Sequence, residues 1–125
     1  MKIPDGYLPV MPYLILPGAY KFIDFMKAAF NAEIRQLFPR EDGIIQHAEL
    51  QIQDAVIMLA DATEVYKPLP GSFFLYVEGV DEIFEKAVAN GATPIDKPAD
   101  KDYGRSCGFS DAFGNTWWVT TPIED

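Results

Sequence analysis

The sequence predicts an α+β fold in which two βαβββ modules form a cup-shaped, mostly antiparallel sheet, and three observations lead to this prediction. Two segments place apolar residues at helical spacing. Each segment follows a strand-like run that ends near a glycine, and each precedes three further strand-like runs. Ile23 and Ala32 recur as Ile83 and Ala92 at one common offset, which favours an internal duplication.

The chain of 125 residues is long enough to bury one core without disulfides or metals. We expect a single domain over residues 1–125. Its modules cover about residues 8–61 and 71–121, and a Pro/Gly-containing loop at 62–70 joins them. Two curved sheets paired in this way carry the helices outside and leave the open inner face of the cup for function.

The first module begins with a strand from Leu8 to Leu16, a mostly apolar run that stops at the turn-forming pair Pro17-Gly18. A helix follows between Ala19 and Phe30. Its apolar residues recur at helical spacing and its charged residues mark the other side. The apolar set is Phe22, Phe25, Met26, Ala29 and Phe30. Three shorter strands, at about 33–38, 44–52 and 55–60, complete the module.

The second module repeats this order. Residues 72–77 form a strand that stops before Gly79, and a helix that begins at Val80 ends at Asn90-Gly91. The apolar residues of this helix are Val80, Ile83, Phe84, Ala87 and Val88. Strand-like pieces lie near 93–95, 105–110 and 116–121, and a turn at 111–115 joins the last two.

Charge and cysteine content exclude several classes of function. The 19 acidic and 10 basic residues give a net charge of -9, which repels phosphate backbones and anionic lipid. We therefore expect no nucleic-acid and no membrane partner. Cys107 is the only cysteine, which excludes an intrachain disulfide and fits a reducing compartment. No apolar run reaches membrane-spanning length and no signal peptide is recognisable, so we expect a soluble, cytoplasmic protein.

Four motifs follow one another in a recognisable order. They are Ile-Asp-Phe at 23–25, His-Ala-Glu-Leu at 47–50, Val-Ile-Met-Leu-Ala-Asp at 56–61 and Asp-Ala-Phe-Gly-Asn-Thr-Trp-Trp at 111–118. With these motifs the chain resembles the vicinal oxygen chelate superfamily, which contains glyoxalase I, dioxygenases and bleomycin-resistance proteins, and more narrowly its PhnB-like branch. The resemblance implies the glyoxalase/bleomycin resistance fold, a small organic ligand and a pocket that often forms between two chains. A homodimer is expected, because symmetric pairing commonly closes open cups and sheet edges.

Metal-dependent members of the superfamily resemble glyoxalase I in holding a divalent ion with His, Glu or Gln on the first and last strands of each module. The matching positions in this chain are Met11, Met58, Ser72 and Trp118. None of these side chains, and none one position away, is a competent ligand for a hard divalent ion. We therefore expect no metal and no cofactor.

Strand alternation predicts a mostly apolar, aromatic cup with a few hydroxyls, which suits a flat or partly apolar organic molecule. Its main members are Met11, Tyr13, Met58, Ser72, Phe74, Tyr76 and Trp118. Arg105 is a further candidate, either as a clamp for an anionic ligand or as a tie to the acidic turn that precedes the last strand. Alternatively, these side chains merely fill the space between the two halves.

His47 and Glu49 form the arrangement that could carry acid/base chemistry. They lie two residues apart on one strand, so both side chains should face the cup. A neutral histidine oriented by a carboxylate could act as a general base. The alternative is a structural polar pair satisfied by Tyr or Thr hydroxyls. Cys107 has no neighbouring base in sequence, so nucleophilic catalysis by this thiol is not expected.

Three functions are compatible with these patterns. The first is a metal-free binding protein that holds a small organic molecule in an aromatic cup. The second is an enzyme, a lyase, isomerase or dioxygenase-like protein that uses His47 and Glu49 or a divalent metal. The third is a dimeric structural domain without a ligand, in which Trp118 and Tyr76 plug the cup.

Overall fold

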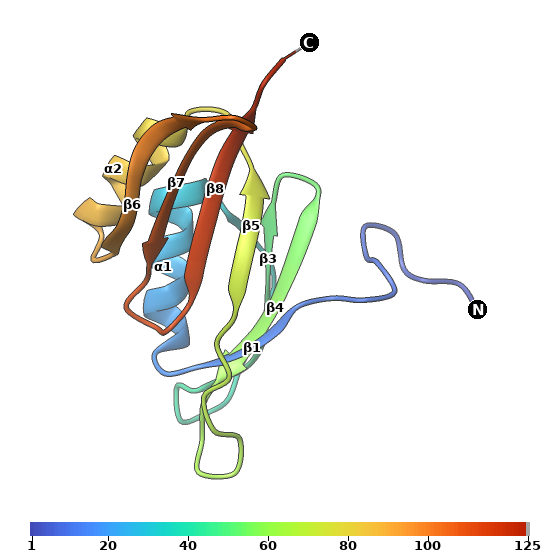
Figure 1. Ribbon diagram of the computed structural model, residues 1–125. Helices are drawn as coiled ribbons and strands as arrows, with labels where there is room; N and C mark the ends of the chain where they lie inside the picture. Colours follow the sequence, from blue (N-terminus) through green and yellow to red (C-terminus); the bar gives the residue numbers. More distant parts are fainter. Residues whose placement is uncertain (125) are drawn as a thin grey trace. The chain divides into compact units, whose positions relative to one another are not determined.

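A computed structural model describes residues 1–124. Helices and strands follow one another in the order βαβββ twice, as the sequence predicts (Figure 1). The chain divides into two compact units, Met1–Pro70 and Gly71–Asp125, and each carries one of these repeats. The α+β class and the two βαβββ modules are therefore confirmed.

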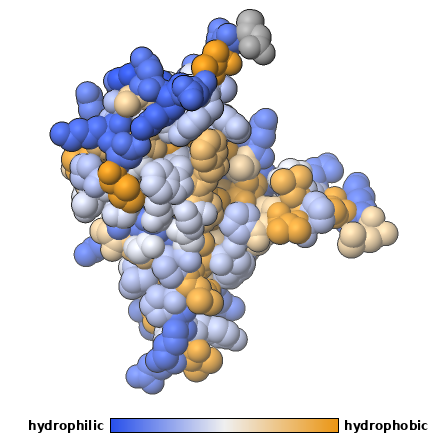
Figure 2. Space-filling view, viewed as in Figure 1, coloured by the Kyte–Doolittle hydropathy of each residue, from blue (hydrophilic) through white to orange (hydrophobic). Residues whose placement is uncertain are grey.

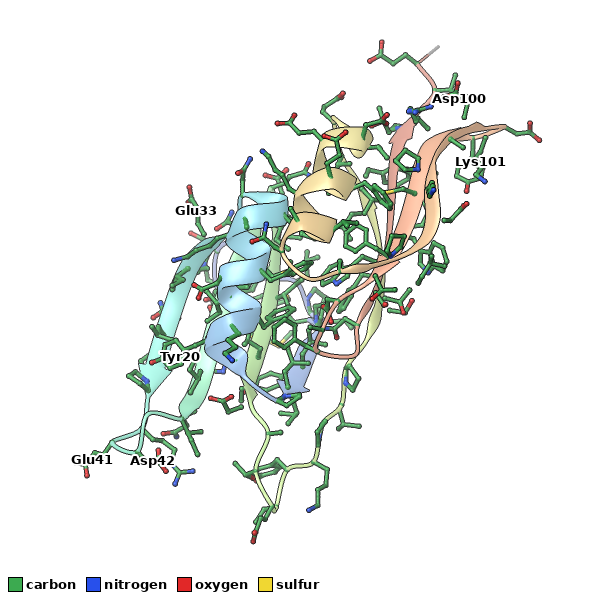
Figure 3. The ribbon with its side chains drawn as sticks, turned by 90° about the vertical axis from the view of Figure 1, so that its left-hand side faces the viewer. Tyr20, Glu33, Glu41, Asp42, Asp100 and Lys101 are labelled. Atoms are coloured by element: carbon green, nitrogen blue, oxygen red, sulfur yellow. The ribbon has the colours of Figure 1, made fainter. Side chains whose placement is uncertain are left out.

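The first unit contains one mixed sheet and one helix. Its elements are β1 (Tyr13–Leu16), α1 (Ala19–Phe30), β2 (Glu33–Pro39), β3 (Ile45–Ile52) and β4 (Ala55–Asp61). The strands lie in the order β1-β4-β3-β2, with β1 parallel to β4 and the other pairs antiparallel. Figure 3 shows α1 across one face of this sheet, with Tyr20 on the helix and Glu41 and Asp42 in the turn between β2 and β3.

Helix α1 begins where the sequence pattern places it, because Gly18 and Asp61 fix its start. Gly18 precedes it with φ 75°, a left-handed conformation that glycine adopts without steric cost. The Asp61 carboxylate then accepts the Ala19 N–H at 2.8 Å and the Ile45 N–H at 2.7 Å. One acidic side chain therefore joins the start of the helix to the start of β3.

The second unit repeats this plan with β5 (Ser72–Tyr76), α2 (Val80–Ala89), β6 (Thr93–Lys101), β7 (Gly104–Ser110) and β8 (Thr116–Pro122). The sheet order is β5-β8-β7-β6, with only β5 and β8 parallel. In Figure 1, α2 lies on one face of this sheet. Trp117 and Val119 on β8 are fully buried, and the Phe73 ring stacks on Trp117 with centroids 4.5 Å apart.

The turn between β7 and β8 explains the Asp-Ala-Phe-Gly-Asn motif. The buried Asp111 carboxylate accepts the backbone N–H groups of Phe113 and Asn115 through one oxygen. Its other oxygen accepts the Asn115 amide at 2.8 Å and the Trp117 indole N–H at 2.9 Å. The motif therefore acts as a structural lock on the turn and on the Trp117 ring.

Two strands differ from their predictions by more than one residue, and both contain or follow prolines. The first strand begins at Tyr13 rather than Leu8, because Pro9 and Pro12 have no N–H to donate to a neighbouring strand. The strand predicted near 93–95 extends to Lys101 as β6. It tolerates its prolines because it is an edge strand whose pairing with β7 shifts register at two points.

Candidate functional site

The face of the first sheet that lies away from α1 brings together several residues that the sequence singles out. Glu49 on β3 pairs with Met58 on β4, and Met58 pairs in turn with Tyr13 on β1. His47 lies two residues before Glu49 and therefore on the same face. Ala48, between them, is fully buried on the other face. The two side chains proposed for acid/base chemistry thus face the same side.

A chain of hydrogen bonds runs across this face. The Tyr7 hydroxyl donates to Glu49 Oε1 at 2.5 Å, within the range of a hydrogen bond between a hydroxyl and a carboxylate. The His47 ring contacts Glu49 Oε2 through Nε2 at 2.8 Å. His47 Nδ1 lies 2.9 Å from the Tyr13 hydroxyl. Both carboxylate oxygens and both ring nitrogens therefore have partners.

The Glu49 carboxylate determines which atoms carry the hydrogens in this chain of hydrogen bonds. An ionised carboxylate only accepts hydrogen bonds, so His47 Nε2 carries a hydrogen and donates it to Glu49. In the neutral ring, Nδ1 is then the acceptor for the Tyr13 hydroxyl. The arrangement has one consistent direction, from Tyr13 through His47 to Glu49, and it leaves no free lone pair on the imidazole.

Arg35 completes the surroundings of Glu49 and was not indicated by the sequence pattern. Its guanidinium carbon lies 4.6 Å above the centre of the Tyr7 ring, which is a cation–π contact. The same group donates to Gln51 Oε1 at 3.1 Å and to the Asp5 carbonyl at 2.9 Å. Tyr7 and Arg35 were missed because they meet only through folding, and Arg35 lies at an irregularity in the pairing of β2.

The electrostatics of the face favour an ionised Glu49 and a neutral Tyr13. Burial by itself raises the pKa of the Glu49 carboxyl. The hydrogen bonds that Tyr7 and His47 donate, together with the charge of Arg35, outweigh burial and lower that pKa below its usual value. Burial and then the Glu49 charge raise the pKa of Tyr13. At neutral pH Tyr13 is therefore a phenol that can donate a hydrogen bond, not a phenolate base.

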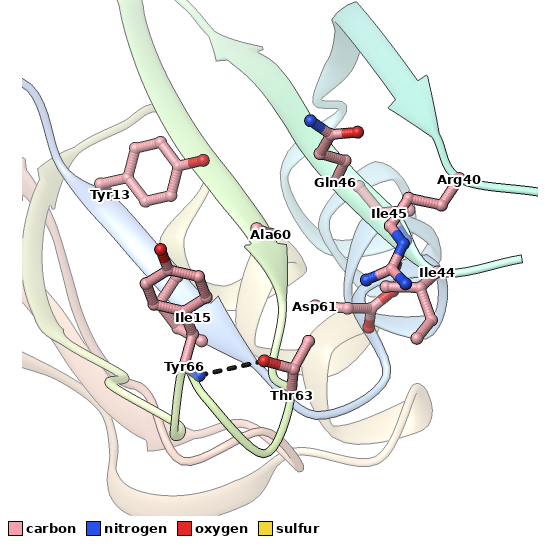
Figure 4. Close-up of a pocket in the computed structure, with 10 residues that line it drawn as sticks. All are labelled: Tyr13, Ile15, Arg40, Ile44, Ile45, Gln46, Ala60, Asp61, Thr63 and Tyr66. Atoms are coloured by element: carbon pink, nitrogen blue, oxygen red, sulfur yellow. Dashed lines mark hydrogen bonds between the residues drawn. The ribbon is translucent and has the colours of Figure 1, made fainter. Parts of the chain in front are cut away.

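A cavity of about 400 Å³ in the first unit adjoins this chain of hydrogen bonds (Figure 4). Tyr13 belongs to both. The other lining residues combine a second tyrosine and apolar side chains with a few polar groups: Ile15, Arg40, Ile44, Ile45, Gln46, Ala60, Asp61, Thr63 and Tyr66. Figure 4 shows the Tyr66 backbone N–H bonded to the Thr63 hydroxyl, a contact of 3.0 Å that shapes the loop on this side. Of these residues, Tyr13 is a member of the predicted cup, whereas Arg40 and Tyr66 lie in connecting segments and Gln46 lies on β3.

The corresponding face of the second unit is aromatic. Phe74 on β5 pairs with Trp118 on β8, and the Phe74 ring meets Tyr76 edge-on at 5.2 Å. The three rings are exposed to 53%, 63% and 36% for Phe74, Tyr76 and Trp118 respectively. Ser72 begins the same face and is paired with Thr116. Strand alternation therefore sorted these side chains onto one face as predicted.

Arg105 lies on the other face of the second sheet, which corrects its assignment to the ligand pocket. Its Nε and Nη2 atoms donate to the Asp81 carboxylate, at the start of α2, at 2.6 and 2.8 Å. Its Nη1 donates to Asp100 at 3.1 Å. The guanidinium thus joins α2 to β6, and it neither faces the Trp118 side nor binds the turn at 111–115. Cys107, on the same strand, is buried; burial, with the charges of Asp81 and Asp96, raises its pKa to about 11, so its thiol is unreactive.

The four positions that correspond to metal ligands do not fit a divalent metal ion. Met11 lies before β1, where its sulfur accepts the Leu8 N–H at 3.2 Å. Met58, Ser72 and Trp118 offer a thioether, a hydroxyl and an indole, none of which is a ligand for a hard divalent ion. Across residues 1–124, no group of three or more His, Cys, Asp or Glu side chains is placed to hold a metal ion.

Surface character differs strongly between regions. Figure 2 shows hydrophilic side chains gathered over β6 and hydrophobic side chains along the N-terminal segment, where Leu8 and Val10 are exposed. Neither helix in the described part of the chain has the length and apolar character needed to cross a membrane.

Comparison with known proteins gives a family match over most of the chain. The model of the Glyoxalase/Bleomycin resistance protein/Dioxygenase superfamily matches residues 14–119. An uncharacterized protein of Mycobacterium bovis is 30% identical over an alignment of 126 residues, which covers 91% of this chain and 83% of that protein.

Solved structures share the fold at low sequence identity. TioX from a Micromonospora species superimposes with a TM-score of 0.71 at 22% identity, covering 91% of this chain and 99% of TioX. A PhnB protein from Bacillus cereus has a TM-score of 0.70 at 16% identity, with 91% and 99% covered. TnmS3, an antibiotic binding protein from a Streptomyces species, has a TM-score of 0.64 at 20% identity, with 94% and 100% covered.

Proposed function

This chain belongs to the Glyoxalase/Bleomycin resistance protein/Dioxygenase superfamily, and we propose that it is a metal-free protein that binds a small organic molecule. Two binding surfaces are proposed, each the helix-free face of one sheet. Tyr13 and Met58 lie on the face of the first unit, and Phe74, Tyr76 and Trp118 lie on the face of the second. Ser72 is included because it shares that second face. Met11 is retained at the edge of the first face, just before β1.

The observation that carries the proposal is the hydrogen-bonded state of His47. Both of its ring nitrogens are engaged, one by Glu49 and one by Tyr13. A general base needs a free lone pair within reach of the substrate proton. The Tyr13 hydroxyl, which donates its hydrogen to His47, instead presents its oxygen to the cavity as a hydrogen-bond acceptor beside an apolar wall. Aromatic area with a few oriented polar groups is typical of small-molecule binding sites.

A ligand that fits the face of the first unit is flat or partly apolar and carries a hydrogen-bond donor for the Tyr13 oxygen. On the separate face of the second unit, the exposed rings of Phe74, Tyr76 and Trp118 favour stacking against the planar group of a ligand bound there. The similarity to TnmS3, an antibiotic binding protein, supports an organic ligand of natural-product size. Absence of any competent donor at the four family positions supports binding without a metal.

Binding is tested by a thermal-shift screen of planar aromatic compounds, followed by calorimetry on compounds that raise the melting temperature. We expect Tyr13→Ala to weaken binding at least tenfold, because it removes both the ring and the hydroxyl oxygen that accepts from the ligand. Tyr20→Ala, on the exposed face of α1, is the matched control and should leave affinity unchanged. Equal affinities for both variants would contradict the proposed surface. Stoichiometric zinc, nickel, iron or manganese in purified native protein would contradict the metal-free assignment.

The alternative function is catalysis by the same chain of groups, as a lyase, isomerase or dioxygenase-like enzyme. One observation favours it: the path from Glu49 through His47 ends on a tyrosine hydroxyl at the wall of the cavity. His47→Gln separates the two functions. A binding protein keeps most of its affinity in this variant, whereas an enzyme loses turnover of the bound compound while affinity remains.

We also propose that the protein is a cytoplasmic homodimer in which the two modules fold as one domain. Four edge strands, β1 and β2 in one sheet and β5 and β6 in the other, offer backbone groups for pairing. The exposed aromatic face of the second unit offers apolar area to bury. Light scattering at micromolar concentration should give twice the mass of 14.0 kDa, and a monomer would contradict the assembly.

A further inference from the structure

Tyr7 lies in a small site on the sheet of the first unit, formed by Glu49, Gln51 and Arg35 and here called the seat. Glu49 and Gln51 lie on β3 and Arg35 on β2, whereas Tyr7 belongs to the segment before β1. The seat contacts the phenol in two ways. Glu49 Oε1 accepts the hydroxyl at 2.5 Å, and the Arg35 guanidinium lies 4.6 Å from the ring centre.

The segment before β1, residues 1–12, is here called the arm. Tyr7 holds the arm on the sheet to a large extent through these contacts. The neighbouring backbone bonds within the segment are local, from Tyr7 N–H to the Pro4 carbonyl and from Leu8 N–H to the Met11 sulfur. The apolar side chains that follow Tyr7 gain little from the sheet, since Leu8 and Val10 are exposed. The arm therefore delivers one phenol to the seat rather than a hydrophobic surface.

Gly6 allows the arm to come this close. Its φ is 87°, and a Cβ at this position would lie 2.9 Å from both terminal nitrogens of Arg35. Arg35 in turn donates to the Asp5 carbonyl at 2.9 Å. Any other residue at position 6 both strains the backbone and presses on the group that covers the Tyr7 ring.

We propose that Glu49, Arg35 and His47 form a recognition site for phenols, and that Tyr7 occupies it as an internal ligand that a hydroxyaromatic molecule can replace. The chemistry is specific for this class. A buried carboxylate selects a good O–H donor, and a guanidinium selects the face of an electron-rich ring. His47 holds the second carboxylate oxygen, so that Oε1 alone points to the phenol. Compounds without a hydroxyl leave a buried acceptor without a donor.

The inference deepens the proposed function by naming a ligand class, and for a natural ligand it rests on that function. A phenol bound in this seat lies beside His47 and Tyr13, at the margin of the cavity. The arm then acts as a cap that a tighter phenol displaces. The seat itself depends only on the contacts of Tyr7.

The test uses the Tyr7→Ala variant of the full chain and p-cresol, which is the tyrosine side chain as a free molecule. We expect p-cresol to bind this variant, seen as a rise in melting temperature and as heat in calorimetry. Toluene, which fills the same ring space without a hydroxyl, should bind about tenfold to a hundredfold more weakly, the ratio expected for one hydrogen bond to a charged group. Tyr7→Phe keeps the ring in place and should bind neither compound. Equal binding of p-cresol and toluene, or equal binding to Tyr7→Ala and Tyr7→Phe, would overturn the proposal.

A second pair of variants keeps the test decisive if Tyr7→Ala does not fold. Gly6→Ala leaves Tyr7 intact but weakens its seating, so p-cresol binding should appear in this variant. Gly43→Ala is the control, because φ there is also positive, at 82°, while no atom lies within 4 Å of the added Cβ. Binding of p-cresol to neither variant, or equally to both, contradicts the internal-ligand model. If the wild type still binds planar compounds through Tyr13 in that case, the proposed function stands and only the phenol site fails.

Discussion

Substitution of Tyr7 by phenylalanine isolates a single hydrogen bond in the site. The variant keeps the ring beneath Arg35 and removes only the hydroxyl that donates to Glu49 at 2.5 Å. Glu49 is only 6% exposed, so water replaces the lost donor poorly. A hydrogen bond to a charged group contributes about 1.5–3 kcal/mol, and we expect the free energy of unfolding to fall by this amount at pH 7.

The pH dependence of this loss follows from the lowered pKa of Glu49. A carboxyl whose pKa is lower in the folded state stabilises the protein above its unfolded value, close to 4.5, and this contribution is lost as the pH falls through the folded pKa. Tyr7 is one cause of the lowering, so Tyr7→Phe should flatten the dependence of stability on pH in this acidic window. Below it Glu49 is protonated, and the difference between the proteins should shrink to about 1 kcal/mol or less, the value of a neutral hydrogen bond.

Urea unfolding of both proteins at pH 7, and at an acidic pH chosen by titration so that Glu49 is protonated in both, measures these differences. Tyr20→Phe is the control, because Tyr20 is exposed on α1, and its unfolding free energy should match that of the wild type. A difference between Tyr7→Phe and the wild type that is below about 0.5 kcal/mol at pH 7, or that is the same at both pH values, would refute the role assigned to the Tyr7–Glu49 hydrogen bond.

Three further outcomes follow from the structure. Asp111→Ala should lower the free energy of unfolding by about 3–5 kcal/mol in urea titrations, because it removes the acceptor of the buried Asn115 and Trp117 donors. A loss below about 1 kcal/mol would contradict the structural role assigned to the Asp111 carboxylate. Arg105→Gln should leave ligand affinity unchanged, since the guanidinium binds Asp81 on the helix side of its sheet; weaker binding would restore Arg105 to the pocket. Thermal unfolding can be followed by tryptophan fluorescence, which reports only the second unit, and by circular dichroism, which reports both units. The two signals should share one midpoint if the modules form one domain, and two separated midpoints would show that the units unfold independently.

The features that the sequence predicts are those set by the spacing of apolar and polar residues along a helix or a strand. Both helices start at the predicted residue because a glycine and an apolar stripe mark each start within a few positions. Strand alternation placed His47 and Glu49 on one face for the same reason, since residues two apart on a strand must point the same way. Their mutual hydrogen bond then required only that nothing came between them.

The parts that sequence did not predict depend on contacts between distant residues. Tyr7 and Glu49 are separated by 42 positions, and Arg105 and Asp81 by 24. Arg105 illustrates the limit most clearly. An arginine fork fits a ligand anion or a neighbouring carboxylate equally well, so only the direction of its strand face decided between them.

Equivalent positions in the two modules have diverged in a complementary way, and this divergence can be tested. Glu49 pairs across its sheet with Met58, and Gly108 pairs in the same manner with Trp118. A Cβ at Gly108 would overlap the Trp118 indole, so one module has a carboxylate where the other has space for a ring. Gly108→Ala should therefore push the Trp118 indole outward into water and shift its fluorescence emission to the red. The free energy of unfolding should fall by about 1 kcal/mol, the lower end of the range typical of overpacking, because Trp118 lies at the surface. In a Trp118→Ala background the same substitution should cost nothing, and an equal cost in both backgrounds would mean that Gly108 is required by the strand rather than by the ring.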